Sequence, residues 1–250
     1  STPNSINSTV NVSGNVTVEG PTVFSSNQAS SSTFYELHFN GDGSTTQLLN
    51  ALPNVSNVHF IAVPNSSVEL STNPLKFTGN SHFEVEGGAT FNFGFDNSNS
   101  ALYISQISGG GNQWSHRTGA YTYITDPAGL DGTNNADGNV RNIPASGRST
   151  GQTGSTFHYI GKTNQESGDF HTPGSTNKII IVELDNNVNT LTLTSTTGTS
   201  NLLDIKRGIF VESEAAHISG SGNLTITDGG FRTSVISTTG TVPQLTGTYA

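Results

Sequence analysis

The sequence predicts an all-β fold in which short strands wind into a solenoid, interrupted by one long irregular insertion. Apolar and polar residues alternate in short runs, which is the period of a strand with one buried face. Gly, Asn, Asp and Pro separate these runs after only a few residues. This spacing is tighter than the ~8–12 residues between turns in a β-sandwich, and it suits a repeatedly bending coil. The strand candidates cover 16–18, 58–63, 67–70, 75–77, 82–85, 90–95, 102–107, 178–184, 190–194, 202–205, 209–211, 217–218, 224–227 and 231–236.

An internal echo supports a repeated unit. Segments 14–20, 79–87 and 222–229 each place Gly-Asn before an alternating strand, and an acidic residue with Gly after it. Gly and Asn tolerate the left-handed backbone that sharp corners require. The alternative is a generic turn–strand–turn unit of any β protein. If the solenoid is correct, 178–184, 202–205 and 224–227 stack as parallel strands in adjacent coils.

The composition excludes several classes of protein. The chain has 250 residues, and 9 Lys+Arg against 18 Asp+Glu give a net charge of −9. A nucleic-acid partner would require a basic stripe, and membrane insertion by a helix would require ~20 consecutive apolar residues; the sequence has neither. Cys is absent, which removes disulfides, zinc–thiolate sites and cysteine nucleophiles, and Met is absent too. Because both residues are sensitive to oxidation, their absence suits an extracellular, cell-surface or virion location.

Changes in the strand rhythm divide the chain. The predicted parts are an Asn/Ser/Thr-rich segment at 1–33, first coils with a capping turn at 34–107, an insertion or subdomain at 108–176, later coils at 177–236 and a tail at 237–250. The capping turn is the one helix candidate, which Ser44 begins and Pro53 stops. The insertion is predicted because the strand rhythm is lost from Ser108 to Ser175, and a structureless loop of that length is uncommon within a compact domain.

A family resemblance lies in 39–95. A Gly-Asp-Gly turn at 41–43 is followed by a Leu-rich turn, a strand ending at Pro64, and the segments 75–77 and 85–90. This order resembles the entry of pectate-lyase-like right-handed parallel β-helix proteins of the phage tailspike and tail-fibre type. The resemblance implies a single-stranded right-handed parallel β-helix with a capping helix after the Gly-Asp-Gly turn. It also implies a homo-oligomer, with a trimer as one form, since some such proteins hide open faces by trimerising.

Paired carboxylates are the candidates for catalysis. Glu183 and Asp185 follow an apolar run and share one face if the strand continues, with Cα atoms ~6.6 Å apart. Glycosidases use two carboxyl groups, one as acid and one as base or nucleophile. Two other Glu-x-Glu pairs, at 84–86 and 212–214, fit equally well. The alternative for all of them is the solvated outer face of a strand.

A calcium loop is the one cofactor site that the sequence leaves open. Oxygen-bearing side chains occur at alternate positions of 131–138, as in calcium loops. Ala136 stands where an EF-hand needs Gly, and Asn142 where it needs a closing Glu, so an EF-hand is excluded. What remains is a looser calcium site or a simple Asp/Asn/Gly turn, and the candidate ligands are Asp131, Asn135 and Asp137. The seven histidines show no metal-ligand spacing.

The predicted insertion holds the best candidates for ligand binding. Sugars are bound by aromatic faces flanked by planar polar groups, and Trp, Tyr and Arg are enriched at binding hot spots. The residues of these types are Trp114, His116, Arg117, Tyr121 and Tyr123. Loops on a rigid scaffold often carry function, so we predict that these side chains lie on an exposed or intersubunit surface. The alternative is that they form the insertion's own small core.

Three functions follow from these features. The first is a non-enzymatic surface module, as in a fibre, spike or adhesin, that binds a glycan or neighbouring subunits. The second is a tailspike-like polysaccharide depolymerase. The third is a lattice or capsid-decoration protein. The weak match to catalytic patterns favours the first function over the second.

Overall fold

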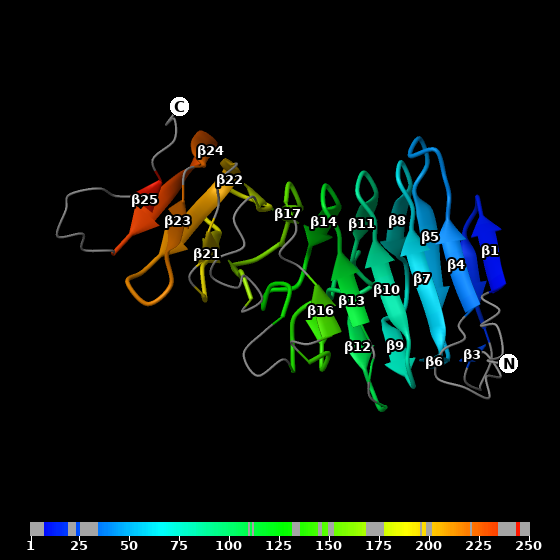
Figure 1. Ribbon diagram of the computed structural model, residues 1–250. Helices are drawn as coiled ribbons and strands as arrows, with labels where there is room; N and C mark the ends of the chain where they lie inside the picture. The colour runs from blue at the N-terminus through cyan, green and yellow to red at the C-terminus, as the bar shows by residue number, and fades with distance from the viewer. Residues whose placement is uncertain are drawn as a thin grey trace, which may run out of the picture.

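The protein is an all-β molecule built from parallel strands in stacked sheets (Figure 1). The computed structural model describes residues 8–19, 24–25, 35–109, 111, 113–131, 136–144, 147–149, 153–168, 178–195, 197–198, 202–220, 222–234 and 244–245. No helix within these ranges is long and apolar enough to cross a membrane.

Three sheets carry most of the strands. The six-stranded sheet contains, in order, β1 (Ser8–Val12), β4 (Tyr35–Phe39), β7 (Val58–Ala62), β10 (His82–Val85), β13 (Gln113–His116) and β16 (Arg148–Ser149). The five-stranded sheet contains β3 (Phe24–Ser25), β6 (Val55–Ser56), β9 (Leu75–Thr78), β12 (Ile104–Gln106) and β15 (Val140–Arg141). The eleven-stranded sheet contains β2 (Val16–Val18), β5 (Gln47–Ala51), β8 (Ser67–Leu70), β11 (Thr90–Asn92), β14 (Tyr121–Ile124), β17 (Thr156–Tyr159), β19 (Ile179–Glu183), β22 (Leu202–Glu212), β20 (Thr190–Thr192) and β18 (Gln165–Glu166), with β24 (Asn223–Thr233) paired to β22. A three-stranded sheet of β21 (Thr197–Gly198), β23 (Ile218–Gly220) and β25 (Gln244–Leu245) lies toward the C-terminus.

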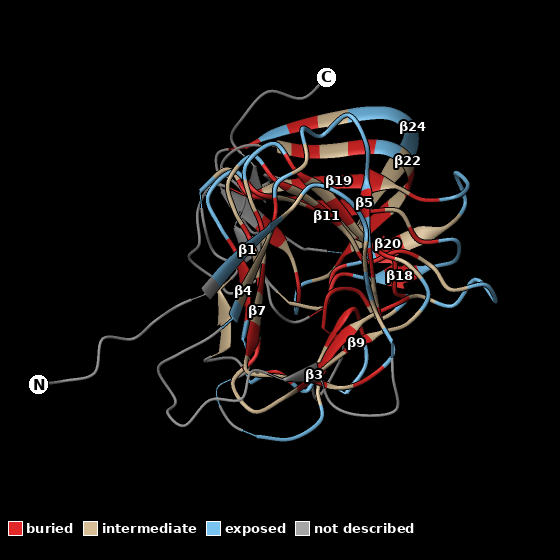
Figure 2. Ribbon diagram, turned by 90° about the vertical axis from the view of Figure 1, so that its right-hand side faces the viewer, coloured by how far each residue is buried: buried red, intermediate tan, exposed pale blue. Residues whose placement is uncertain are grey.

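The chain visits the three large sheets in turn. From β1 to β15 it passes through the six-, eleven- and five-stranded sheets in that order, and each of β1 to β14 pairs in parallel with the strand three places further on. Seen from one end, the sheets surround a common buried core (Figure 2). The expected stacking of 178–184, 202–205 and 224–227 is confirmed, because β19, β22 and β24 are parallel neighbours.

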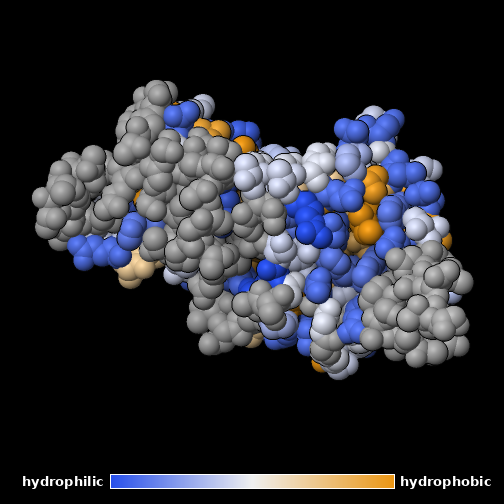
Figure 3. Space-filling view, in the orientation of Figure 1, coloured by the Kyte–Doolittle hydropathy of each residue, from blue (hydrophilic) through white to orange (hydrophobic). Residues whose placement is uncertain are grey.

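Alternation along each strand builds the core. In β7, Val58, Phe60 and Ala62 point inward and are fully buried, while the residues between them point outward. Since the strands are in register, inward aromatic rings lie in a row: the centroids of Phe39 and Phe60 are 6.4 Å apart, and those of Phe60 and Phe83 are 6.2 Å apart. This stacked interior holds the sheets together. The outer face of the six-stranded sheet is mostly hydrophilic, with a small apolar area (Figure 3).

The prediction of an insertion at 108–176 is wrong for the residues described there. Strands β13 to β18 lie in the same sheets as their neighbours, and β13 pairs with β10 as β14 pairs with β11. The apolar rhythm is hidden in this stretch because polar side chains, including His116 and Thr122, occupy buried positions. The sheets therefore continue where the sequence predicted that the chain leaves them.

The prediction of a capping helix at 44–51 is also wrong. Residues 47–51 form β5, in which Gln47, Leu49 and Ala51 are buried. The Gln47 side chain accepts a hydrogen bond from the Gly41 amide (2.9 Å), and it donates to the Val12 carbonyl (2.8 Å). This buried amide ties the Gly-Asp-Gly turn to the preceding cycle and satisfies backbone groups of both.

Candidate functional site

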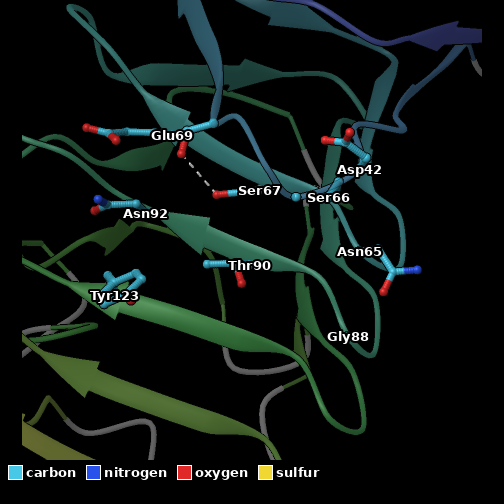
Figure 4. Close-up of a pocket in the computed structure, with 11 residues that line it drawn as sticks. Asp42, Asn65, Ser66, Ser67, Glu69, Gly88, Thr90, Asn92 and Tyr123 are labelled. Carbon is cyan, nitrogen blue, oxygen red and sulfur yellow. Dashed lines mark hydrogen bonds between the residues drawn. The ribbon is translucent and has the colours of Figure 1, made fainter.

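A cavity of about 510 Å³ hollows the outer face of the eleven-stranded sheet (Figure 4). Its lining residues are Asp42, Gly43, Thr46, Asn65, Ser66, Ser67, Glu69, Gly88, Thr90, Asn92 and Tyr123. Strands β8, β11 and β14 form its floor, and the turns that precede β5, β8 and β11 form its wall. The Thr46 and Ser67 hydroxyls lie 3.2 Å apart across this wall.

Two further cavities extend this hollow into a groove. One of about 400 Å³ shares Asp42 and Thr46 with it, and one of about 340 Å³ shares Tyr123. We call these three cavities together the sheet groove. From β5 to β22 it crosses six strand spacings, or ~29 Å at ~4.8 Å per spacing. The groove therefore has the shape that an elongated ligand requires.

The floor of the sheet groove is one row of outward side chains. In the parallel register Glu69 lies beside Asn92, Asn92 beside Tyr123, and Tyr123 beside His158. A carboxylate, an amide, a phenol and an imidazole thus follow one another at the strand spacing. Burial raises the pKa of Glu69 above its ordinary value.

A chain of polar contacts connects β14, β17 and β19. The Tyr121 hydroxyl lies 2.6 Å from His158 Nδ1, and His158 Nε2 lies 3.1 Å from Glu183 Oε2. Burial lowers the pKa of His158 to about 4, although the Glu183 charge opposes this shift. His158 is therefore neutral near pH 7, with Nδ1 accepting from the Tyr121 hydroxyl and the ring hydrogen on Nε2. Lys206 Nζ, 3.6 Å from the same Glu183 oxygen, completes the arrangement.

Tyr123 presents an aromatic ring to the groove. Its centroid is 5.0 Å from that of Tyr121 and 4.9 Å from that of His158, so neighbours on two strands hold the ring in place. Burial raises the pKa of Tyr121, and the nearby Tyr123 contributes a smaller increase in the same direction. The Tyr121 hydroxyl therefore stays protonated. The pair is half-buried, with the ring of Tyr123 lining both the central cavity and its neighbour.

The structure brings together two sets of sequence candidates. Glu183 and Asp185, the carboxylate pair, line the same cavity as Tyr123. Asp185 lies beyond the end of β19, and the register with β22 already shifts between Val182 and Glu183, so the two carboxylates do not continue one regular strand. Lys162 and Arg207 line this cavity too.

Trp114 and His116 do not lie on a surface, so this part of the prediction is wrong. Both face inward from β13 and are completely buried. Trp114 packs 6.3 Å from the Phe93 ring, and His116 packs 4.5 Å from the Phe157 ring, as centroid distances. The period of two along the strand places both residues on the core side.

Arg117 belongs to a different face from the tyrosines. It follows β13 of the six-stranded sheet and donates two hydrogen bonds to the Glu84 carboxylate, at 2.6 and 3.0 Å. His82 lies beside them, with Nε2 2.8 Å from the Ser115 hydroxyl, and burial together with the neighbouring His59 lowers its pKa to about 4. Arg117 is thus held in an ion pair on the six-stranded sheet.

The calcium candidates do not form a site in the described residues. Asp131 is buried and pairs with Arg148, Asp137 is exposed, and Asn135 lies outside the described residues. No group of three His, Asp or Glu side chains in the described ranges is arranged to hold a metal ion. Arg148 thus supplies the charge that neutralises Asp131.

Sequence reasoning missed His158, Glu69 and Asn92. The sequence pattern carried no signal for His158, because Thr156-Phe157-His158-Tyr159 alternates polar and apolar residues, whereas Tyr121-Thr122-Tyr123-Ile124 has Thr122 between two aromatic residues. Only the register of β14 with β17 places His158 beside Tyr123 on the outer face. Comparisons with protein-family models, with curated proteins and with solved structures found no match for this chain.

Proposed function

We propose that the chain is a right-handed parallel β-helix, in which each cycle through the six-, eleven- and five-stranded sheets is one coil. Parallel pairing of every third strand supports this proposal. The right hand follows from the general rule that about 98% of crossover connections between parallel strands are right-handed. The proposal includes a relation to the pectate-lyase-like tailspike and tail-fibre proteins, which 39–95 resembles.

We propose that this β-helix is a surface module that binds a glycan in the sheet groove. The observation that carries the proposal is the row of Glu69, Asn92 and Tyr123 on the floor of a groove ~29 Å long. A glycan is elongated and covered with hydroxyls, so it matches hydrogen-bonding groups that repeat at a fixed spacing. A partly exposed tyrosine ring adds an apolar surface for the C–H face of a sugar.

The arrangement of carboxyl groups favours binding over cleavage. Glu69, whose pKa burial raises, would suit the role of general acid. It lies on β8, four strand spacings from Glu183 on β19, which is ~19 Å at ~4.8 Å per spacing. The two carboxyls of a glycosidase are only about 5–9.5 Å apart, so this pair does not serve one glycosidic bond.

A polysaccharide depolymerase is the second candidate function, because Glu183 and Asp185 line one cavity with Tyr123. Incubation with capsular polysaccharides separates the two functions. An enzyme releases new reducing ends, and the Glu183→Gln variant abolishes the release; a binding module gives none with either protein.

We propose an extracellular, cell-surface or virion setting and assembly of several copies, with a trimer as the simplest form. Edge strands β1 and β24 support self-association, because each has one edge without a strand partner in the described part of the chain. The mass of the native assembly tests this proposal. A trimer supports a fibre, spike or adhesin, whereas large sheets or shells support a lattice or capsid-decoration protein.

Replacing Tyr123 with alanine is expected to weaken glycan binding at least tenfold, because a central aromatic contact is lost. A glycan array identifies a binding polysaccharide, and titration calorimetry measures its affinity for each variant. Tyr35→Ala is the matched control, since Tyr35 is an exposed tyrosine on β4 of the six-stranded sheet. Equal affinity of Tyr123→Ala and the unaltered protein would contradict the proposed site.

A further inference from the structure

A separate cavity of about 380 Å³ lies next to the sheet groove, and we call it the corner pocket. It lies beyond the ends of β11, β14 and β17, where the chain turns out of the eleven-stranded sheet. Its lining residues are Phe95, Asn99, Ser100, Ala101, Thr125, Asp126, Pro127, Arg141, Lys162 and Thr163. Lys162 also lines the groove cavity that contains Tyr123, so the two spaces adjoin.

One wall of the corner pocket is a short hairpin that its own hydrogen bonds hold in shape. Phe95 and Ala101 form an antiparallel bridge at its base. Within it, the Asp96 carboxylate accepts hydrogen bonds from the Ser98 and Ser100 amides, at 2.9 and 2.8 Å. Asn99 takes a left-handed φ of 64° at the tip. The hairpin therefore presents Phe95 and Asn99 in a fixed geometry before any ligand arrives.

The opposite wall is held by a buried amide. Asn139 Oδ1 accepts hydrogen bonds from the Thr125 and Asp126 amides, at 2.9 and 3.0 Å, and its Nδ2 donates to the Leu102 carbonyl at 2.6 Å. Asn139 is completely buried, so these bonds are shielded from water. The pocket is thus preformed on both sides, which lowers the entropy lost when a ligand binds.

The charges of the corner pocket leave one cation in excess. Arg141 donates to the Asp126 carboxylate at 2.8 Å and its guanidinium lies 3.8 Å from the centroid of the Tyr103 ring, so this pair is neutral overall. Lys162 has no carboxylate within ion-pair distance in the described residues. The three cavities of the sheet groove carry as many carboxylates as cations, or more. In a protein of net charge −9, a pocket with an excess cation favours an anionic ligand.

The Lys162 ammonium is positioned by two contacts. Nζ donates to Asn99 Oδ1 at 2.6 Å and lies 4.5 Å from the centroid of the Phe95 ring. An ammonium group has three N–H donors, so two of them are left for a ligand after the bond to Asn99. The remaining lining offers the exposed hydroxyl of Thr163 and the apolar surface of Pro127, whereas the buried Thr125 hydroxyl donates to the Gly94 carbonyl at 3.1 Å.

We propose that the corner pocket binds a sugar-sized ligand that carries a carboxylate, with the carboxylate on Lys162. The hydroxyl and apolar groups of the lining suit the rest of a sugar ring. This ligand is either a free acidic sugar or an acidic residue of a polysaccharide that lies in the adjoining groove. The second source rests on the proposed function, since it requires a glycan beside Tyr123.

Titration with sodium glucuronate tests the pocket by itself, with glucose as the uncharged comparison. Glucuronate should bind at least tenfold more tightly than glucose, and its affinity should fall as salt is added. Lys162→Gln should reduce glucuronate affinity at least tenfold without unfolding the protein, because Lys162 is exposed. Lys76→Gln, on β9 of the five-stranded sheet, is the control and should change nothing. Equal binding of glucuronate and glucose, or an unchanged affinity in Lys162→Gln, would overturn the proposal.

A polysaccharide that contains glucuronate separates the two sources. If its binding falls with both Lys162→Gln and Tyr123→Ala, the acidic residue belongs to a glycan in the groove. If free glucuronate binds and the polymer does not, the corner pocket takes a free acid. That result supports the corner pocket and contradicts only the proposed glycan binding in the sheet groove. If the polymer depends on Tyr123 but is insensitive to Lys162, the groove stands and the corner pocket fails.

Discussion

Replacing Trp114 with alanine is expected to lower the free energy of unfolding by about 3–5 kcal/mol, the range for large-to-small changes in a core. The indole is completely buried and lies in register with Phe83 on the neighbouring strand. Removing it leaves a cavity among the Phe93 and His116 rings, which the fixed strand spacing prevents from closing. Urea unfolding followed by far-ultraviolet circular dichroism measures the loss.

Trp114→Phe is the matched control for this experiment. It keeps an aromatic ring in the row and removes the indole N–H, which has no hydrogen-bond partner in the described residues. The loss of stability should be less than half of that in Trp114→Ala. If Trp114→Ala instead leaves stability unchanged and weakens only ligand binding, Trp114 is a surface residue and its placement in the core is wrong.

The strand rhythm of the sequence was enough to predict parallel neighbours such as β19, β22 and β24. Apolar residues recur in short runs along the chain, and Gly or Asn stands at corners between strands, as Asn57 and Asn65 do on either side of β7, with φ values of 57° and 68°. The rhythm failed at β13 and β14, because His116 and Thr122 are polar yet buried. A polar residue on the inner face interrupts the alternation of apolar and polar residues from which a strand is predicted. Its buried position becomes evident only when its cross-strand neighbours are known.

The site depended on information that one strand does not contain. Tyr121 and Tyr123 were chosen for their chemistry, and their place on one face follows from their spacing of two. The contact of Tyr121 with His158 joins residues 37 positions apart, and it exists only because β14 and β17 are adjacent and in register. Trp114 was chosen by the same chemical criterion and was wrong, because its strand turns that position toward the core.

The helix predicted at 44–51 failed for a related reason. Leucine at 48 and 49 suits a short helix, but the buried side chains of Gln47, Leu49 and Ala51 follow a period of two. Local propensity is a weak guide when a neighbouring strand offers a complete ladder of hydrogen bonds. Pairing of β5 with β8 therefore decided the conformation.

Acid is expected to destabilise the protein through its buried histidines, and His116 should have the largest single effect. Burial, with a smaller contribution from the Lys178 charge, lowers the pKa of His116 to about 3. In the unfolded chain a histidine has a pKa of about 6.5, so between these values the unfolded state binds one more proton. The stability is fully present above pH 6.5 and is lost as the pH falls toward about 3, to a total of roughly 4–5 kcal/mol.

His116→Leu isolates this effect. The imidazole has no hydrogen-bond partner for either nitrogen in the described residues, and it packs against the Trp114 and Phe157 rings. Leucine should therefore raise stability at pH 7, since an unpaired buried polar group is costly. Between pH 7 and pH 4.5 the variant should also lose ~3 kcal/mol less than the unaltered protein, which corresponds to one proton over the two pH units below 6.5. Urea unfolding at half-unit pH steps gives both values, with His217→Leu, at the turn before β23, as the control outside the core row. Parallel stability curves for His116→Leu and the unaltered protein would contradict the assignment, because they would require His116 to be protonated in the folded state.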